Sequence, residues 1–418
     1  MRAFPTSLVL SLALPFGFTT SLTSTFAADW PSFRGADRQD ISRESGLLKE
    51  WPENGPKQVW LNQDVGLGYS GYAIVGDSLY TLGARDAVEY VIAVDVATGK
   101  EKWSAEAGAL LTNNWGNGPR STPTVDGDHV YAMGGKGTLV CLTKSDGKEV
   151  WRVTMESLGG QLPGWGFCES PLVEGNLVIV TPGGPQGTLA AFDKLTGTPA
   201  WRSATWTDPA QYSSIVPVDH HGTRQLIQLT MQSVAGVNAA NGELLWKNEF
   251  PGKTAVIPTP IFSEGQVFVT AGYGVGCKSF KIGADNSIEE LYQTLEMGNH
   301  HGGVVLVNGH LYGFAEKNGW TCMDFKTGEV KWVEKRTLGK GAIHAADGML
   351  YLLEEKTGTV VLITATPEGW QEHGRFTLQP QTTQRNPKGM IWTHPVVSGG
   401  RLYLRDQELL FSFDVSGK

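Results

Sequence analysis

A glycine-containing turn followed by a short segment that ends in an aromatic residue recurs along most of this chain. The clearest copy is residues 93–103, Ala-Val-Asp-Val-Ala-Thr-Gly-Lys-Glu-Lys-Trp, and residues 191–201 repeat it closely. The aromatic residues that end the eight copies lie 38 to 50 residues apart. They are Trp60, Trp103, Trp151, Trp201, Trp246, Tyr292, Trp332 and Trp370. This spacing is typical of the four-stranded blades of a β-propeller, so we predict an all-β chain of eight antiparallel blades.

Short apolar segments alternate with tight turns inside each unit. In the second unit we expect strands at 122–125, 129–133, 138–142 and 149–151, because turn residues separate these segments. Several first segments open with proline, namely Pro123, Pro171, Pro260 and Pro395. Proline cannot donate a hydrogen bond to a neighbouring strand, so the first strand should be a sheet edge. In a propeller blade, the innermost strand beside the channel is such an edge.

The two ends of the repeat array complement each other. Residues 55–60 form a spare outermost strand, whereas the last unit stops without one. Joining them would complete the eighth blade and close the ring, which removes exposed sheet edges. We therefore expect a propeller over residues 56–418, preceded by a leader over 28–55 that packs over the ring.

The first residues are typical of a secretory signal. Arg2 supplies the positive charge, residues 8–14 are apolar, and residues 25–27 form a small-residue cleavage signal. We expect cleavage near Ala27 and export to the periplasm or the medium, without a lipid anchor, since no cysteine lies near that junction. The apolar stretch is too short to span a membrane. The formal net charge of −8 argues against a nucleic-acid partner.

The cysteines predict neither a disulfide framework nor a haem. Cys141 and Cys322 occupy equivalent points of different units, so a ring would hold them apart. We expect free and mostly buried thiols. No Cys-x-x-Cys-His motif is present, so covalent haem attachment is not expected.

The loops that join one unit to the next should carry the function. They lead from an outermost strand to the next innermost strand, so they cross one face and end at the channel mouth. Three of them are long, at 104–119, 152–168 and 371–391. The residues that precede or open the inner strands include Tyr69, Ser70, Tyr72, Asn113, Trp115, Arg120, Trp165, Cys168, Glu169, Tyr212, Asn299, His300, His301, Lys340, His344, Trp392 and His394. We predict that they converge on a ligand site at this mouth.

Each of these candidates also has a structural interpretation. Arg120 and Glu169 open adjacent units, so they form either an inter-blade salt bridge or an anion clamp beside a general base or metal ligand. Trp115 and Trp165 lie in glycine-rich loops, where they either plug the ring or offer a stacking face for a flat ligand.

The histidine candidates also have both a functional and a structural interpretation. His300 and His301 are a weak metal signal, because neighbours on a strand point to opposite faces. At most one should face the channel, and the other should pack between blades. His394 precedes Pro395 and either caps the strand or faces the channel.

The repeat resembles that of the pyrroloquinoline-quinone (PQQ) repeat propellers, a family that includes quinoprotein alcohol dehydrogenases and non-catalytic relatives. The family pattern Ala-x-Asp, Thr-Gly-Lys and Trp is matched at 93–103, nearly at 191–201 and partly in three further units. The resemblance covers residues 56–418. It implies that the repeat tryptophans dock between neighbouring blades and have a structural role.

For the enzymes of this family, the resemblance implies a quinone at the channel mouth, an acidic base and usually Ca²⁺. By position, Glu169 would be the catalytic acid or base and Arg120 the partner of a quinone oxygen or carboxylate. The other candidate cofactor-binding residues are Trp115, Trp165, Tyr212, His300, Trp392 and His394. The chain departs from the enzymes in lacking a vicinal cysteine pair and an Asp paired with Glu169.

Two other functions remain open. The chain is also similar to the propeller subunit of the outer-membrane protein assembly machinery, which is non-catalytic and binds envelope proteins. A sugar- or polymer-binding protein or hydrolase is the third interpretation, although no suitably paired carboxylates are visible. We place a quinone-dependent oxidoreductase slightly ahead of a scaffold.

Overall fold

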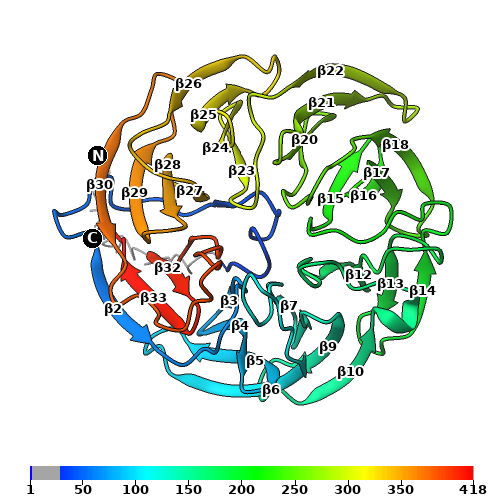
Figure 1. Cartoon of the computed structure of the whole chain (residues 1–418), viewed down its shortest axis with the longest axis horizontal. Helices are drawn as coiled ribbons and strands as arrows, with labels where there is room; N and C mark the ends of the chain where they lie inside the picture. Colours follow the sequence, from blue (N-terminus) through cyan, green and yellow to red (C-terminus); the bar gives the residue numbers. More distant parts are fainter. Residues whose placement is uncertain (2–28, 418) are drawn as a thin grey trace.

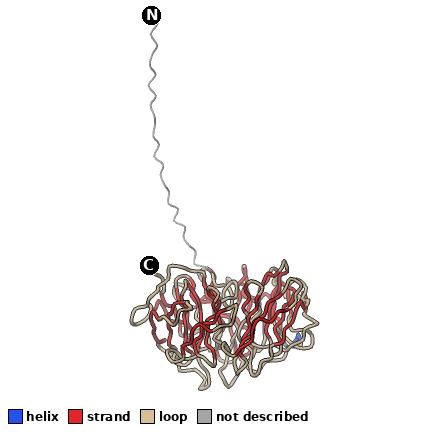
Figure 2. Tube along the Cα trace, turned by 90° about the horizontal axis from the view of Figure 1, so that it is seen from above, coloured by secondary structure: helices blue, strands red, loops and turns tan. Residues whose placement is uncertain are grey.

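The computed structural model describes Met1 and residues 29–417, and the described residues form eight β-sheets around a central axis (Figure 1). Seen from the side, the sheets make a disc (Figure 2). The predicted eight-bladed propeller is therefore confirmed. The predicted secretory signal over residues 1–27 falls almost entirely outside the described residues.

Each of the first seven blades is built from four consecutive strands, innermost first. The first four are β3–β6 (Ala73–Val75, Ser78–Arg85, Val88–Asp95, Glu101–Ala109), β7–β10 (Thr124–Asp126, His129–Met133, Thr138–Thr143, Glu149–Thr154), β11–β14 (Leu172–Glu174, Leu177–Val180, Ala190–Asp193, Pro199–Arg202) and β15–β18 (Val216–His220, Thr223–Leu229, Ser233–Asn238, Leu244–Glu249). The next three are β19–β22 (Ile261–Ser263, Gln266–Ala271, Gly276–Ile282, Ile288–Thr294), β23–β26 (Val304–Val307, His310–Ala315, Gly319–Asp324, Val330–Glu334) and β27–β30 (Gly341–Ala346, Met349–Glu354, Thr359–Thr364, Glu372–Thr377). A single 3-10 turn, η1 (Glu156–Leu158), interrupts the strands of the described chain.

The eighth blade is closed by a strand from the other end of the chain, as predicted. It contains β31 (Val396–Ser398), β32 (Arg401–Asp406), β33 (Leu409–Asp414) and β2 (Lys57–Asn62). β2 pairs antiparallel with β33, with Trp60 opposite Ser412 and Leu61 opposite Phe411. The four prolines that predicted inner edges lie directly before β7, β11, β19 and β31, which are all innermost strands.

The repeated glycine and the repeated aromatic residue interlock across neighbouring blades. The ring of Trp103 in blade one packs on Gly147 of blade two, where an added Cβ would lie 2.5 Å from the ring. Gly147 also has a φ of +73°, which disfavours other residues. The indole N–H of Trp103 donates to the Lys144 carbonyl at 3.1 Å. The same ring-on-glycine packing joins Trp60 to Gly99, Trp151 to Gly197, Trp201 to Gly242 and Tyr292 to Gly328.

Trp246 departs from this pattern, since its indole donates to Gln225 of its own blade. Trp370 likewise donates to Glu372 of its own blade, whereas the Trp332 indole donates to the Thr366 carbonyl of the next blade. At the other positions the repeated aromatic residue joins neighbouring blades, so its recurrence indicates ring assembly and not chemistry.

Residues 29–54 do more than pack over the ring, which corrects the expectation for the leader. Trp30 exchanges backbone hydrogen bonds with Ile74 of blade one, and β1 (Ile41–Ser42) pairs in parallel with β27 of blade seven. The segment between them crosses the centre of the ring (Figure 1). Arg38 is 2% exposed there and donates to the carbonyls of Ser170, Pro171 and Ile215, on blades three and four. The leader therefore occupies the central channel.

A second buried arginine joins blade eight to blade one. Arg405 on β32 is fully buried, and its guanidinium donates to Thr81 Oγ1 and to four backbone carbonyls. The carbonyls belong to Gly66, Ser70, Leu82 and Gln407. Because every contact is with main chain or hydroxyl oxygen, Arg405 acts as a cross-link at the ring closure.

All four cysteines are free, and Cys141, Cys277 and Cys322 are buried, as predicted. Within the described residues, none of the helical structure has the length and apolar character that a membrane crossing would require.

Candidate functional site

The side of the channel predicted to carry the ligand site contains a pocket of about 370 Å³. The leader forms its floor, and loops that precede the inner strands form its walls. All eight blades contribute. The lining residues that bear on its chemistry are Trp30, Phe33, Arg34, Asp40, Tyr69, Tyr72, Trp115, Arg120, Trp165, Cys168, Tyr212, Tyr273, His300, His301, Lys340, Trp392 and His394.

Seven of the eight residues singled out from the sequence line this pocket. They are Trp115, Arg120, Trp165, Tyr212, His300, Trp392 and His394. They lie in the loops that precede five of the blades, and they meet because each of these loops ends at the same mouth. Glu169 is the exception.

The pocket walls are built from aromatic pairs. Trp165 and Tyr212 have ring centroids 5.5 Å apart, and the Tyr212 hydroxyl accepts the backbone N–H of Trp165. Tyr69 and Trp392 lie 4.9 Å apart, centroid to centroid. Trp115 is 43% exposed at the rim. Such rings offer large, stiff apolar faces on which a flat molecule can stack.

Arg120 is held at the wall without a carboxylate. Two of its N–H groups donate to the carbonyls of Gly118 and Gly116, at 2.7 and 2.8 Å. Its guanidinium carbon lies 5.1 Å from the centroid of the Tyr69 ring. The inter-blade salt bridge to Glu169, considered above as the structural alternative, is not formed, because the two side chains bind different partners.

Glu169 lies outside the pocket, which corrects its expected position at the mouth. It is 2% exposed, and its carboxylate accepts hydrogen bonds from the Thr181 N–H at 2.6 Å, the Thr181 hydroxyl at 2.7 Å and Gln228 Nε2 at 3.3 Å. Thr181 follows β12 and Gln228 is on β16, so Glu169 joins blades three and four. Its neighbour Cys168 faces the pocket instead. A carboxylate so enclosed does not fit the role of a base that touches a ligand.

Glu169 should make stability depend on pH. Burial raises its pKa to about 7, against the hydrogen bonds from Thr181 and the charge of Arg38. Between the ordinary glutamate pKa of 4.5 and about 7, the folded state therefore holds a proton that the unfolded state has released. The free energy of unfolding should fall as pH rises through this window.

We expect the wild type to lose roughly 2–3 kcal/mol between pH 5 and pH 8, relative to Glu169→Gln. Glutamine keeps the shape and can still accept the Thr181 N–H, but it does not titrate. Urea unfolding of both proteins at the two pH values measures this difference. Parallel stability profiles for the two proteins would contradict the prediction.

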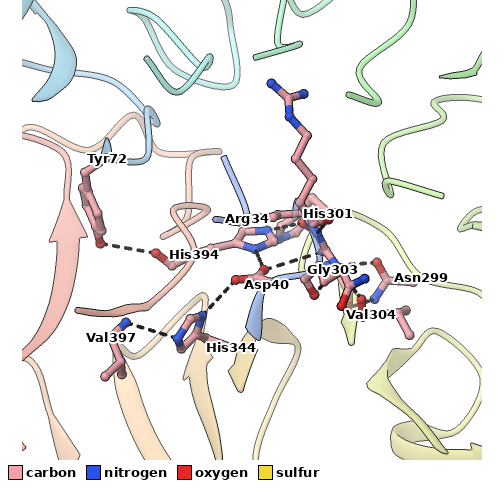
Figure 3. Close-up of polar contacts among 12 residues, drawn as sticks. Arg34, Asp40, Tyr72, Asn299, His301, Gly303, Val304, His344, His394 and Val397 are labelled. Atoms are coloured by element: carbon pink, nitrogen blue, oxygen red, sulfur yellow. Dashed lines mark hydrogen bonds and ion pairs between the residues drawn. The ribbon is translucent and has the colours of Figure 1, made fainter. Parts of the chain in front are cut away.

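The pocket floor is a buried charged cluster centred on Asp40 of the leader (Figure 3). Asp40 Oδ1 lies 2.9 Å from His344 Nδ1, and Oδ2 lies 3.0 Å from His394 Nδ1. Arg34 adds an ion pair to Oδ2 at 3.6 Å. Burial alone would raise the pKa of Asp40, but these hydrogen bonds and the Arg34 charge hold the pKa well below its usual range. Asp40 is therefore ionised.

The second nitrogens of the two histidines face different partners. His344 Nε2 accepts the backbone N–H of Val397 at 3.2 Å, whereas His394 Nε2 lies 2.9 Å from the carbonyl oxygen of His301 (Figure 3). Leader and ring are thus joined through two blades, seven and eight.

His300 and His301 both line the pocket, so the expectation that at most one would do so is wrong. They precede β23 in irregular backbone, where strand alternation does not apply. The His300 ring packs against Tyr273 at 4.4 Å. His301 Nε2 lies 2.8 Å from Glu355 Oε2, and burial lowers its pKa despite this carboxylate.

Glu355 gathers three pocket residues from behind the wall. Besides His301, it pairs with Lys340 at 3.0 Å and accepts the Trp392 indole N–H at 3.1 Å. Burial would raise its pKa, but His301 and Lys340 lower it overall. The Glu355 carboxylate therefore binds His301, Lys340 and Trp392 and holds these side chains at the pocket wall.

Sequence reasoning missed Arg34, Asp40, Tyr273 and Glu355. Arg34 and Asp40 precede the repeats, and Tyr273 and Glu355 lie in hairpin turns that interrupt the pattern. The concentration of charge in residues 34–43 is a signal in the leader that the repeat pattern does not include.

No group of three or more His, Cys, Asp or Glu side chains in the described part of the chain is arranged to hold a metal ion. Cys168 faces the pocket, but burial raises its pKa to about 12, opposed by the charge of Arg120. A neutral thiol at this place is a weak nucleophile.

Residues 53–334 match the family model described as outer membrane protein assembly factor BamB. Among curated proteins, the chain is 23% identical over 383 residues to outer membrane protein assembly factor BamB of Yersinia pestis, covering 88% of this chain and 81% of that protein. It is 22% identical over 309 residues to tetrathionate hydrolase of Acidithiobacillus ferrooxidans, covering 72% of this chain. The match spans only 52% of the hydrolase.

Among solved structures, the quinohemoprotein alcohol dehydrogenase of Comamonas testosteroni has a TM-score of 0.64 with 13% identity. The likeness covers 94% of this chain and 81% of that one. At this identity, it establishes a shared fold alone.

Proposed function

We propose that this chain, which belongs to the family described as outer membrane protein assembly factor BamB, is an exported propeller that binds a flat ring compound at its channel mouth. The supporting observation is the pocket of about 370 Å³ walled by Trp115, Trp165, Tyr212 and Trp392. A scaffold needs no such cavity, whereas ligand sites are typically concave, largely apolar and furnished with a few polar groups.

A quinone is the first ligand to test, and its bound form would accept electrons from a substrate. The aromatic walls and Arg120 suit a flat, oxygen-rich ring. The residues do not suit Ca²⁺, which takes six to eight oxygen ligands. The lining carboxylate of Asp40 is already engaged by Arg34, His344 and His394, and Glu169 faces away. We therefore propose quinone binding without calcium as the oxidoreductase form of this function.

Trp165→Ala should strongly reduce retention of PQQ. Mixed with PQQ and desalted, the wild type should keep the quinone absorbance, because Trp165 and Tyr212 provide a stacking face. The loss of one stacked indole should weaken binding by about tenfold or more. The matched control is Trp370→Ala, since Trp370 lies on the outer rim, where its indole donates to Glu372 and its ring packs against Trp332, away from the pocket. Equal retention by Trp165→Ala and wild type, or none by wild type, would reject this proposal.

The second candidate is a scaffold for envelope proteins, favoured by the family and by the curated relatives named assembly factors. Two exposed apolar residues, Trp115 and Leu162, lie in the long loops of the pocket face. A protein partner could cover them. Cross-linking in the envelope from a cysteine placed at 162 tests this candidate, and an absence of specific adducts would count against it.

A further inference from the structure

Some charged side chains around the pocket have a partner of opposite charge, and Arg120 has none in the part of the chain that the structure describes. Asp40 is the single carboxylate among the lining residues, and Arg34, His344 and His394 already surround it. Arg120, by contrast, has no carboxylate within 4 Å in the described part of the chain. Its five N–H groups make two hydrogen bonds, to the carbonyls of Gly116 and Gly118. The remaining donors are held in place by those bonds and by the Tyr69 ring.

His394 and His344 are both fully engaged at the floor. His394 Nδ1 lies 3.0 Å from Asp40 Oδ2, and its Nε2 lies 2.9 Å from the carbonyl oxygen of His301. His344 Nδ1 lies 2.9 Å from Asp40 Oδ1, and its Nε2 accepts the Val397 N–H. The ring nitrogens of both histidines therefore have partners within the protein and are not the groups that hold a ligand.

The pocket therefore presents one cation without a counter-ion inside an acidic protein. Arg34 pairs with Asp40, and Lys340 pairs with Glu355, which leaves Arg120 as the lining cation without a carboxylate partner among the described residues. The whole chain has a formal net charge of −8. Exposed N–H donors in a partly dry site bind anionic acceptors more strongly than neutral ones.

We infer that the ligand is an aromatic anion, such as a ring carboxylate, whose negative group binds the free edge of Arg120 without a metal ion. This inference rests on the proposed ring-binding function and adds the charge of the ligand. Lys340 does not take this role, since Glu355 already holds it. Arg120 is thus the residue that distinguishes anionic from neutral rings.

Three probes with one ring system test the inference: naphthalene-2-carboxylate, its carboxamide and its carboxamidine. Calorimetric titration with EDTA present should show the carboxylate binding about tenfold tighter than the carboxamide, with the amidine weakest. In Arg120→Gln, carboxylate affinity should fall to the carboxamide level while carboxamide affinity stays within about twofold. Arg120→Lys should keep a preference for the carboxylate.

Arg152→Gln is the matched control, because Arg152 lies on the outer strand β10 and pairs with Glu149 at the surface. It should behave as the wild type. Equal affinity for carboxylate and carboxamide in the wild type would overturn the inference and leave ring binding intact. Binding of none of the three probes would overturn ring binding itself. Carboxylate binding that disappears with EDTA would show that a metal holds the anion, against the inference.

Discussion

Arg405→Met should destabilise the folded ring by about 5 kcal/mol or more, enough to prevent folding in a marginally stable protein. Arg405 is fully buried where blade eight meets blade one, and it donates to Thr81 Oγ1 and to the carbonyls of Gly66, Ser70, Leu82 and Gln407. Methionine fills the volume but donates nothing. Each buried oxygen left without a partner costs about 1–3 kcal/mol.

The cost of removing the buried Arg405 charge cannot be offset by replacing its partners as well. Replacing a buried ion pair by apolar residues can be harmless when both partners change. Here four partners are backbone carbonyls, which no substitution removes.

Arg401→Met on the same strand is the control for Arg405. Arg401 is partly exposed and donates to a single carbonyl, that of Val96, at 2.8 Å. Its replacement should cost about 1 kcal/mol. Urea unfolding followed by tryptophan fluorescence gives both values, and similar losses for the two variants would refute the cross-link interpretation.

Asp40→Ala should have the second largest effect, a loss of about 3–5 kcal/mol. Removing this carboxylate leaves the buried Arg34 guanidinium without its counter-charge and leaves His344 Nδ1 and His394 Nδ1 without their partner. The leader should then leave the channel. We expect a lower melting temperature and rapid proteolytic cleavage within residues 34–43, with the blades still folded.

Asp37→Ala in the same segment is the matched control for Asp40. Asp37 is 49% exposed at its side chain and pairs with the exposed Arg43. Exposed pairs contribute about 0–1 kcal/mol, so this variant should melt and resist protease as the wild type does. Protection of the leader in Asp40→Ala equal to that in Asp37→Ala would show that the cluster does not anchor it.

The architecture could be predicted because its signals are local and repeated. The turn at Gly147 and the ring of Trp103 have counterparts in most units for one reason, the contact between neighbouring blades. The prolines marked inner strands, since a missing N–H is tolerated only at an edge. The spare segment at 55–60 predicted the strand that closes the ring. These patterns also placed the candidate pocket residues, because loops that precede inner strands must end at one mouth.

What the sequence could not predict depends on side-chain direction and on unrepeated contacts. Glu169 and Cys168 are neighbours in one loop, yet one turns between blades and the other into the pocket. Outside a strand, no periodic pattern determines the direction in which a side chain points. The same irregular backbone let both His300 and His301 face the ligand site. The two histidines that contact Asp40 lie 304 and 354 residues away along the chain, and no repeat constrains these contacts.

The antiparallel joint between β2 and β33 bears on how this protein is made. β33 leaves the ribosome long after β2, so Trp60 and Leu61 must wait for nearly the whole polypeptide before Ser412 and Phe411 arrive. Domains generally fold as units during synthesis, and contacts between distant segments form slowly. During this delay, β2 is an unpaired apolar edge that other nascent chains could capture. We therefore expect the nascent chain to need a chaperone that protects β2 until β33 has been synthesised.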